Sequence, residues 1–448
     1  MTAYDVFVTV LLLFASVIGG IVFSKFEEKS LQKHFLRGLF IKLFGGLSFA
    51  FVYTYYYTYG GDTKAYYFSA QNLTQFFFSD PNLFFRMFFL NKADGLTNFE
   101  YSQLFRFGLD TPEFFIIKIT TLVNIIGLNS YFGTSILFAV LSFIGIWIFY
   151  KSFVKVYPKL KNQFAIPFLY FPSVFFWGSG ISKDTIVIGF MGLTFYFFLK
   201  LSNKFNLVQL ILAFTTATVI FQIKSYVILS IAPVLLVYFF LRRREQIKNK
   251  VIKVIIAPIV LIVGLIAGIV GINVLGALNP KYSVENVIST SQQMQSWHYV
   301  KGENTSDNHG RGSSYTLGEY DPTILGVLSI APSAINVSLF RPYFWEVKNA
   351  GMFAAAIESS AMLLFTIFVF FKLNPATFFK GVLKNDLAFL CISFSLLFLF
   401  FVGFSSYNFG ALMRYKIPAI PFYISGIIII LYNSSKGKSI DQTGFKGA

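Results

Sequence analysis

The sequence predicts an all-α polytopic membrane protein that crosses the bilayer about eleven times and carries juxtamembrane amphipathic helices on its outer face. The chain of 448 residues is 55% hydrophobic and 20% aromatic, with a mean hydropathy of +0.64. Only 13% of its residues are charged, against about a quarter in soluble domains. Many windows of about twenty residues carry no charge, and that length lets an α-helix cross roughly 30 Å of hydrocarbon.

Apolar runs bounded by charged residues mark the expected spans. The first run has no basic n-region and no small-residue cleavage site before it, so we expect a retained helix and no removed signal peptide. The expected spans are residues 5–24, 39–58, 130–150, 164–180, 184–200, 206–223, 225–241, 253–276, 352–371, 387–404 and 415–433.

The distribution of basic residues orients these spans. The segment "LRRREQIKNKVIK" (241–253) is strongly basic, and basic loops remain on the cytoplasmic side. Alternation from this anchor leaves two long loops outside, 59–129 and 277–351, within one integral membrane domain of residues 1–448. The apolar segment 112–127 would invert the loops before it if it spanned, so we expect it to lie at the interface or to re-enter. The net charge of +17 therefore reflects topology, and no nucleic-acid partner is predicted.

The same alternation brings several charged side chains to the outer face, where short turns join the spans. Charges at or within the membrane are costly and mark functional sites. The alternative for any single lysine is that it anchors a helix end at the interface. The residues concerned are Asp62, Lys183, Asp184, Lys224, Arg414 and Lys416.

The stretch "YGGDTKAYY" (59–67) places an acid where the chain leaves the second expected span. Apolar residues recur at helical spacing after it, which predicts an amphipathic helix on the outer surface with Asp62 at its start. They are Tyr66, Ala70 and Leu73, followed by Phe76, Phe77 and Phe78. Asp62 also suits a helix cap, because an acid near a helix N-terminus is favourable. The two roles are compatible.

Several short motifs resemble those of the GT-C superfamily of membrane glycosyltransferases, which take a sugar from a polyprenyl-phosphate carrier. They are "GGDTKAYYFSAQNL", "NSYFGTSILFAVLSFIGIWIFYKSF", "FPSVFFWGSGISKDTIVIGFMGL", "LFRPYFWEVKN" and "RYKIPAIPF", spread over roughly residues 39–433. The resemblance implies a bacterial inner-membrane enzyme that transfers the sugar to a glycan, lipid or protein on the extracytoplasmic side.

In this resemblance the first-loop acid falls on Asp62, where it implies a catalytic base or a ligand of a divalent cation. Many members hold a metal with paired acids, whereas Asp62 has no second acid beside it, so metal dependence stays open. The helix 5–24 is a second departure, because it precedes the usual first helix.

Transfer from a lipid-phosphate donor needs a base near the acceptor hydroxyl, cations for the departing phosphate and a groove for the prenyl tail. Asp62 is the candidate base. The candidate phosphate ligands are Lys183, Lys224, Arg414 and Lys416, and arginine suits bidentate contact best. The candidates for contacts with the acceptor or the outer loops are Tyr66, Asp184, Arg341 and Trp345.

Two other functions stay open. A polysaccharide polymerase or ligase would use late-loop cations such as Arg311 and Arg341 as its decisive residues, whereas a transporter of lipids or solutes would show charges at mid-membrane depth, repeats and broken helices. The long loop 296–322 is suited to closing over an acceptor. The single cysteine, Cys391, excludes a disulfide within the chain and a cysteine-based metal site.

Overall fold

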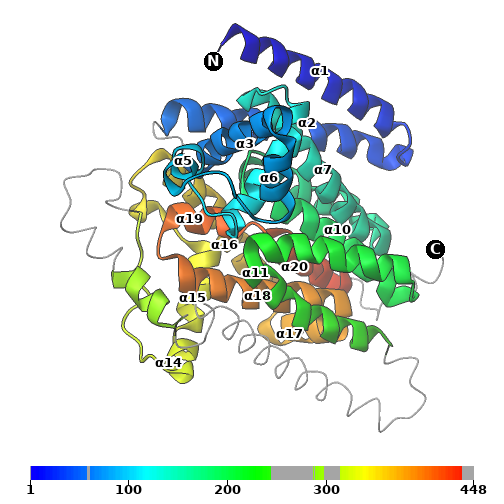
Figure 1. Cartoon of the computed structure of the whole chain (residues 1–448). Coiled ribbons are helices and arrows are strands. Elements are labelled where there is room, and N and C mark those ends of the chain that lie inside the picture. Colours follow the sequence, from blue (N-terminus) through cyan, green and yellow to red (C-terminus); the bar gives the residue numbers. More distant parts are fainter. Residues whose placement is uncertain (1, 58–60, 244–285, 287, 297–312, 436–448) are drawn as a thin grey trace. The chain divides into compact units, whose positions relative to one another are not determined.

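The computed structural model of the chain describes residues 2–57, 61–243, 286, 288–296 and 313–435 (Figure 1). Within these ranges the chain is α-helical, and the only β pairing is an isolated bridge between Ser314 and Asn408. The predicted all-α class is therefore confirmed. The chain forms two compact units, residues 1–225 and 226–448.

Long apolar helices form the frame of the first unit. The polar side chains of Thr2, Ser130 and Ser182 cap three of them, each by accepting a hydrogen bond from a backbone N–H in the first turn. The helices are α1 (Ala3–Ser24), α2 (Lys29–Phe51, continued by a π-helical turn, Val52–Tyr56), α7 (Tyr131–Val156), α10 (Lys183–Asn203) and the kinked α11 (Leu207–Arg243), which continues past the boundary at residue 225.

Close packing of α7 on α10 depends on glycine. A Cβ added to Gly145 would collide with the backbone oxygen of Gly189, and one added to Gly192 would collide with the backbone oxygen of Gly145. Small residues let membrane helices approach closely, and dispersion contacts then hold them together. This packing fixes the position of the N-terminal end of α10, which carries two of the predicted site residues.

Four helices lie in the segment predicted as the first outer loop: α3 (Gly61–Ser79), α4 (Pro81–Phe89), α5 (Asn98–Leu104) and α6 (Pro112–Ile126). The helix predicted after Asp62 is present as α3, which lies against α6 (Figure 1). Tyr66, Ala70 and Leu73 are buried as the spacing predicts, whereas Phe77 and Phe78 are 41% and 70% exposed.

The segment 112–127 is too short for a full span. Helix α6 has 15 residues, so it is about 22 Å long against roughly 30 Å of hydrocarbon. Phe114, Ile116 and Ile117 are fully buried, which accounts for the apolar character of this segment without a membrane span.

The second unit contains α14 (Ile324–Ser329), α15 (Ala331–Phe340), α16 (Ala350–Lys372), α17 (Pro375–Lys384), α18 (Asp386–Ser406), α19 (Phe409–Tyr415) and α20 (Ile420–Ser435). Helix α18 packs between α15 and α20. The segment before α14 is tied to the end of α18, since the Tyr315 amide donates to the Tyr407 carbonyl oxygen at 3.2 Å and the Phe409 amide donates to that of Ser313 at 2.6 Å.

The number of spans differs from the predicted eleven. Within the described ranges seven helices are long and apolar enough to cross a membrane, or eight if α19 and α20, bent by 61°, form one span. The count of eleven is therefore not confirmed, and the expected span 253–276 lies outside the described residues.

Three expected spans take a different form: one is broken by prolines, and two join into a single kinked helix. Residues 164–180 are not one helix: α8 (Lys161–Ala165), a π-helical turn (Ile166–Tyr170) and α9 (Pro172–Trp177) follow one another. Pro167 and Pro172 interrupt this segment, because proline lacks the N–H that a continuous helix needs. The expected spans 206–223 and 225–241 are the two arms of α11, which are separated by non-helical dihedral angles at Lys224.

Candidate functional site

Asp62 is an exposed carboxylate in the first turn of α3. No cation of the described residues lies within 4.0 Å of it. Its negative charge is favoured there by the unpaired N–H groups of the helix start. Asp62 is thus an exposed carboxylate at a helix start, and no cation of the described residues neutralises it.

Lys64 lies two residues further along α3 but points away from Asp62, as side chains at this spacing do. Its Nζ sits 3.5 Å from the centroid of the Tyr131 ring. Burial lowers the pKa of Lys64 to about 8, and the nearby Asp5 carboxylate opposes this shift. Lys64 therefore does not neutralise Asp62.

The lowered pKa of Lys64 predicts its reactivity. In the folded protein, acylation of Lys64 by an amine-reactive reagent should rise with a midpoint near pH 8, because only the neutral amine reacts. In the unfolded chain the midpoint should move toward about 10.4. Between these pH values the unfolded chain binds one more proton, so stability should rise with pH over this range. Peptide mass spectrometry measures the labelling, and equal midpoints in both states would contradict the burial of this amine.

Two ion pairs meet at the start of α10, and we call their four residues the charge cluster: Glu113, Lys183, Asp184 and Lys224. Lys183 Nζ lies 2.5 Å from Glu113 Oε1, and Lys224 Nζ lies 2.5 Å from Asp184 Oδ1. Lys183 and Asp184 are consecutive, so the two pairs are joined through one peptide bond. The structure thus brings together three residues predicted from topology and adds Glu113, which the sequence analysis did not single out.

The two pairs differ in exposure. The side chains of Lys224 and Asp184 are 7% and 5% exposed, whereas those of Lys183 and Glu113 are 20% and 30% exposed. A fully buried pair cannot exchange partners without leaving a charge in an apolar environment. Lys183 is therefore the cation of the cluster that an incoming anion can reach.

In the second unit, Arg341 and Lys416 join a separate polar group. Arg341 Nε donates to both carboxylate oxygens of Glu346 at 3.0 Å. Burial raises the pKa of Glu346, but the hydrogen bonds from Arg341 and Tyr343 outweigh it and lower the pKa overall. Buried Lys416 donates to Ser359 Oγ at 3.1 Å, and that hydroxyl donates to the Arg341 carbonyl oxygen at 3.1 Å.

The remaining predicted residues occupy contrasting surroundings. Trp345 is 82% exposed and stacks on Tyr343 with ring centroids 4.7 Å apart. The half-buried Arg414 lies over the Tyr415 ring, 5.9 Å from its centroid. Tyr66 is buried, and its ring centroid lies 5.5 Å from that of Phe107. Tyr66 therefore packs α3 against the connection between α5 and α6.

Helix α2 carries two polar residues that the sequence analysis did not single out. Lys42 is buried and its Nζ donates to the Val174 carbonyl oxygen at 3.2 Å. His34, two turns earlier on the same face, lies 2.8 Å from Tyr170 OH through Nδ1 and 2.9 Å from Asn162 Oδ1 through Nε2. Both residues face the broken segment of α8 and α9. A lysine inside an apolar helix is the signal that would have identified this site.

A metal centre would need several ligands in one place. Among the described residues, no three histidine, cysteine, aspartate or glutamate side chains come together as a metal site. A divalent cation at Asp62 would thus take its remaining ligands from water or substrate, as magnesium commonly does.

Comparisons of the chain with protein-family models, with curated proteins and with solved structures find no match. Its class follows from the helices themselves. Their length and apolar composition make the chain an all-α integral membrane protein.

Proposed function

We propose that the protein is a membrane glycosyltransferase that moves a sugar from a polyprenyl-phosphate donor to a glycan, lipid or protein acceptor on the extracytoplasmic face of a bacterial inner membrane. The observation that carries the proposal is the exposed Asp62 carboxylate, which has no ion-pair partner among the described residues and lies at the start of α3 shortly after a long apolar helix. An exposed carboxylate without an ion-pair partner is suited to act as a general base.

In the proposed step, Asp62 accepts the proton of the acceptor hydroxyl as its oxygen forms a bond to the anomeric carbon of the donor sugar. The bond between that carbon and the phosphate oxygen breaks, and the phosphate leaves with the electron pair. The proton on Asp62 then passes to water. No oxidant, reductant or further substrate is needed.

The departing phosphate requires positive charge. Lys183 is the proposed first contact because its side chain is partly exposed and begins α10, whose N-terminal N–H groups also favour an anion. Lys224 and Asp184 are proposed to hold this helix start in place from the buried side. The second unit carries Arg414, Lys416, Arg341 and Trp345, and their roles as phosphate or acceptor contacts stay predictions from the sequence.

The Lys183–Glu113 pair makes this proposal testable by kinetics. Glu113→Gln should release Lys183 for the donor and lower the donor KM about three- to tenfold, whereas Lys183→Gln should raise it about tenfold or more. Each change should alter the free energy of unfolding by less than about 1 kcal/mol, because the pair is partly exposed. If Glu113→Gln raises the donor KM as Lys183→Gln does, the ion pair has a structural role, and Glu113 does not compete with the donor phosphate for Lys183.

The deciding experiment measures transfer from a radiolabelled pool of polyprenyl-phosphate sugars in membranes that carry wild type or Asp62→Asn at matched expression. Loss of transfer in the variant supports the proposal. Wild-type transfer in Asp62→Asn together with loss in Arg341→Gln favours the polymerase or ligase alternative, in which the late loop carries the decisive cation. No transfer by wild type from any such donor rejects the proposal.

A transporter is the second candidate, and Lys42 is the observation that favours it. This buried lysine lies within an apolar helix and faces a broken helical segment, and both features are typical of transport sites. In proteoliposomes without acceptor, a transporter would move a fluorescent short-chain prenyl phosphate between the leaflets, and Lys42→Met would abolish that movement. A glycosyltransferase would leave the lipid in place.

A further inference from the structure

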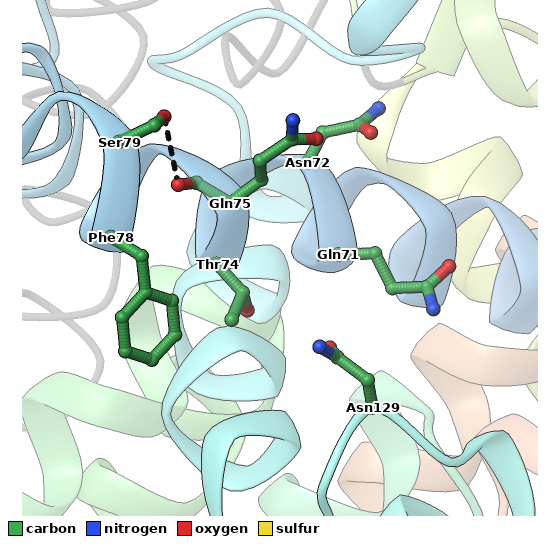
Figure 2. Close-up of a pocket in the computed structure, with 7 residues that line it drawn as sticks. All are labelled: Gln71, Asn72, Thr74, Gln75, Phe78, Ser79 and Asn129. Carbon is green, nitrogen blue, oxygen red and sulfur yellow. Dashed lines mark hydrogen bonds between the residues drawn. The ribbon is translucent and has the colours of Figure 1, made fainter.

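An open polar groove runs along the C-terminal half of α3 (Figure 2). Its volume is about 600 Å³, within the roughly 300–1,000 Å³ of small-molecule sites. Among the residues that the structure describes, no charged side chain lines it. Its lining residues are Gln71, Asn72, Thr74, Gln75, Phe78 and Ser79 of α3, and Asn129 of the turn before α7.

Two carboxamides of the groove are fixed at one end by the protein. Asn72 Nδ2 donates to the Leu104 carbonyl oxygen at 2.8 Å, and Gln71 Nε2 donates to Tyr67 OH at 3.0 Å. These bonds leave Asn72 Oδ1 and Gln71 Oε1 without a hydrogen-bond partner among the described residues. Both oxygens are acceptors whose orientation is set before a ligand arrives, which lowers the entropic cost of binding.

Asn129 presents the complementary group. Its Oδ1 accepts from Asn124 Nδ2 at 2.5 Å, and its carbonyl oxygen accepts from Tyr67 OH at 2.6 Å. The Asn129 Nδ2 donor makes no hydrogen bond with the described residues, and Figure 2 shows this side chain rising from its turn toward α3. The hydrogen bonds of Tyr67 and Asn124 thus fix the positions of Gln71 and Asn129 at this end of the groove.

Gln75 and Phe78 complete the recognition surface. The carboxamide of Gln75 makes no side-chain hydrogen bond with the described residues, so all of its hydrogen-bonding groups are available. Phe78 borders the groove with 70% of its side chain exposed. Amides that recognise hydroxyl groups, together with an aromatic face that covers C–H groups, suit a carbohydrate.

We propose that this groove binds a neutral oligosaccharide as the acceptor, an inference that rests on the proposed glycosyl transfer. The absence of lining charge decides between neutral and anionic glycans, since an anion would lose hydration without gaining a counter-charge. A lipid tail would offer no partner to the remaining donors and acceptors of the four carboxamides. The groove thus assigns the acceptor class, which the motifs of the sequence leave open among glycan, lipid and protein.

The test measures binding without any donor. The full chain in nanodiscs is mixed with neutral linear tetrasaccharides of glucose, galactose, mannose or N-acetylglucosamine, and saturation-transfer NMR reports contact. Wild type is compared with Gln75→Leu, whose amide has no protein bond to lose, with Asn72→Leu, and with Gln163→Leu, an exposed amide of α8 outside the groove. Thermal unfolding and size exclusion confirm that each variant folds.

We expect at least one tetrasaccharide to bind wild type and Gln163→Leu equally. Gln75→Leu should weaken its Kd about three- to tenfold, the loss expected for one hydrogen bond. Absence of binding by all four probes, unchanged affinity in Gln75→Leu, or equal affinity for a phosphorylated tetrasaccharide would overturn the proposal.

Different outcomes reject the proposed acceptor site and the proposed glycosyltransferase function. Transfer to an acceptor that continues unchanged in Gln75→Leu and Asn72→Leu rejects the groove and leaves the glycosyltransferase standing. Tetrasaccharide binding that depends on Gln75, in a wild type that transfers nothing from any polyprenyl-phosphate sugar, supports the groove and rejects the glycosyltransferase.

Discussion

Asp62→Asn is expected to lower the rate of sugar transfer about 10²- to 10⁴-fold, the usual contribution of a general base. The asparagine keeps the size and a hydrogen-bonding oxygen but cannot take the proton of the acceptor hydroxyl. Because Asp62 is exposed and has no ion-pair partner among the described residues, the substitution should leave folding unchanged. Transfer of radiolabel in matched membranes measures the rate, and the melting temperature of purified protein measures folding.

Asp94→Asn is the matched control for this prediction. Asp94 is an exposed carboxylate of the same predicted loop, 67% exposed and 3.9 Å from Arg86, and its loss should leave transfer unaffected. Asp62→Glu keeps a carboxylate at a shifted position and should retain partial activity. A wild-type rate in Asp62→Asn would limit Asp62 to stabilising the start of α3.

Lys224→Met is expected to cause the largest loss of stability, about 3–5 kcal/mol, because it leaves the Asp184 carboxylate buried without its cation. Methionine has a similar volume, so the effect reports charge and not a cavity. Unfolding in detergent micelles, followed by circular dichroism against added dodecyl sulfate, measures the loss. Lys183→Met, which removes the partly exposed pair, should cost less than about 1 kcal/mol.

A double variant distinguishes the destabilisation caused by an unpaired buried charge from the net contribution of the ion pair to the free energy of unfolding. Lys224→Met with Asp184→Leu removes both charges, and most of the lost stability should return. If Lys224→Met proves no less stable than Lys183→Met, the 2.5 Å contact between Lys224 and Asp184 contributes nothing to folding. If the double variant stays as unstable as the single one, other contacts of Lys224 are responsible.

Much of the fold follows from local sequence patterns, because a helix and its buried face depend on residues three or four positions apart. The helix after Asp62 was predicted in this way from Tyr66, Ala70 and Leu73. The proline breaks in residues 164–180 were not predicted, since a hydropathy window averages over them. This averaging affects the predicted number of spans more than the predicted all-α class, because a broken apolar segment is still counted as one span.

Less of the candidate site could be predicted, because its contacts join distant parts of the chain. The predicted topology places Lys183, Asp184 and Lys224 at one membrane face, and in the structure they lie together in the charge cluster. Their pairing was not predicted. Glu113 lies 70 residues from Lys183, and no spacing rule connects them. The lysines were therefore expected as free cations, whereas each one has a carboxylate partner.

The break in α11 determines how this stretch of chain meets the bilayer. A straight helix of 37 residues would be about 55 Å long, far beyond roughly 30 Å of hydrocarbon. The break at Lys224 divides it into arms of about 26 and about 28 Å, each matched to one hydrocarbon thickness. Backbone groups released at a break find no partner in lipid and need polar side chains or water. At this break the chain carries a charged side chain, Lys224, which is buried and paired with the Asp184 carboxylate, so the two arms meet at a polar point that lipid does not reach.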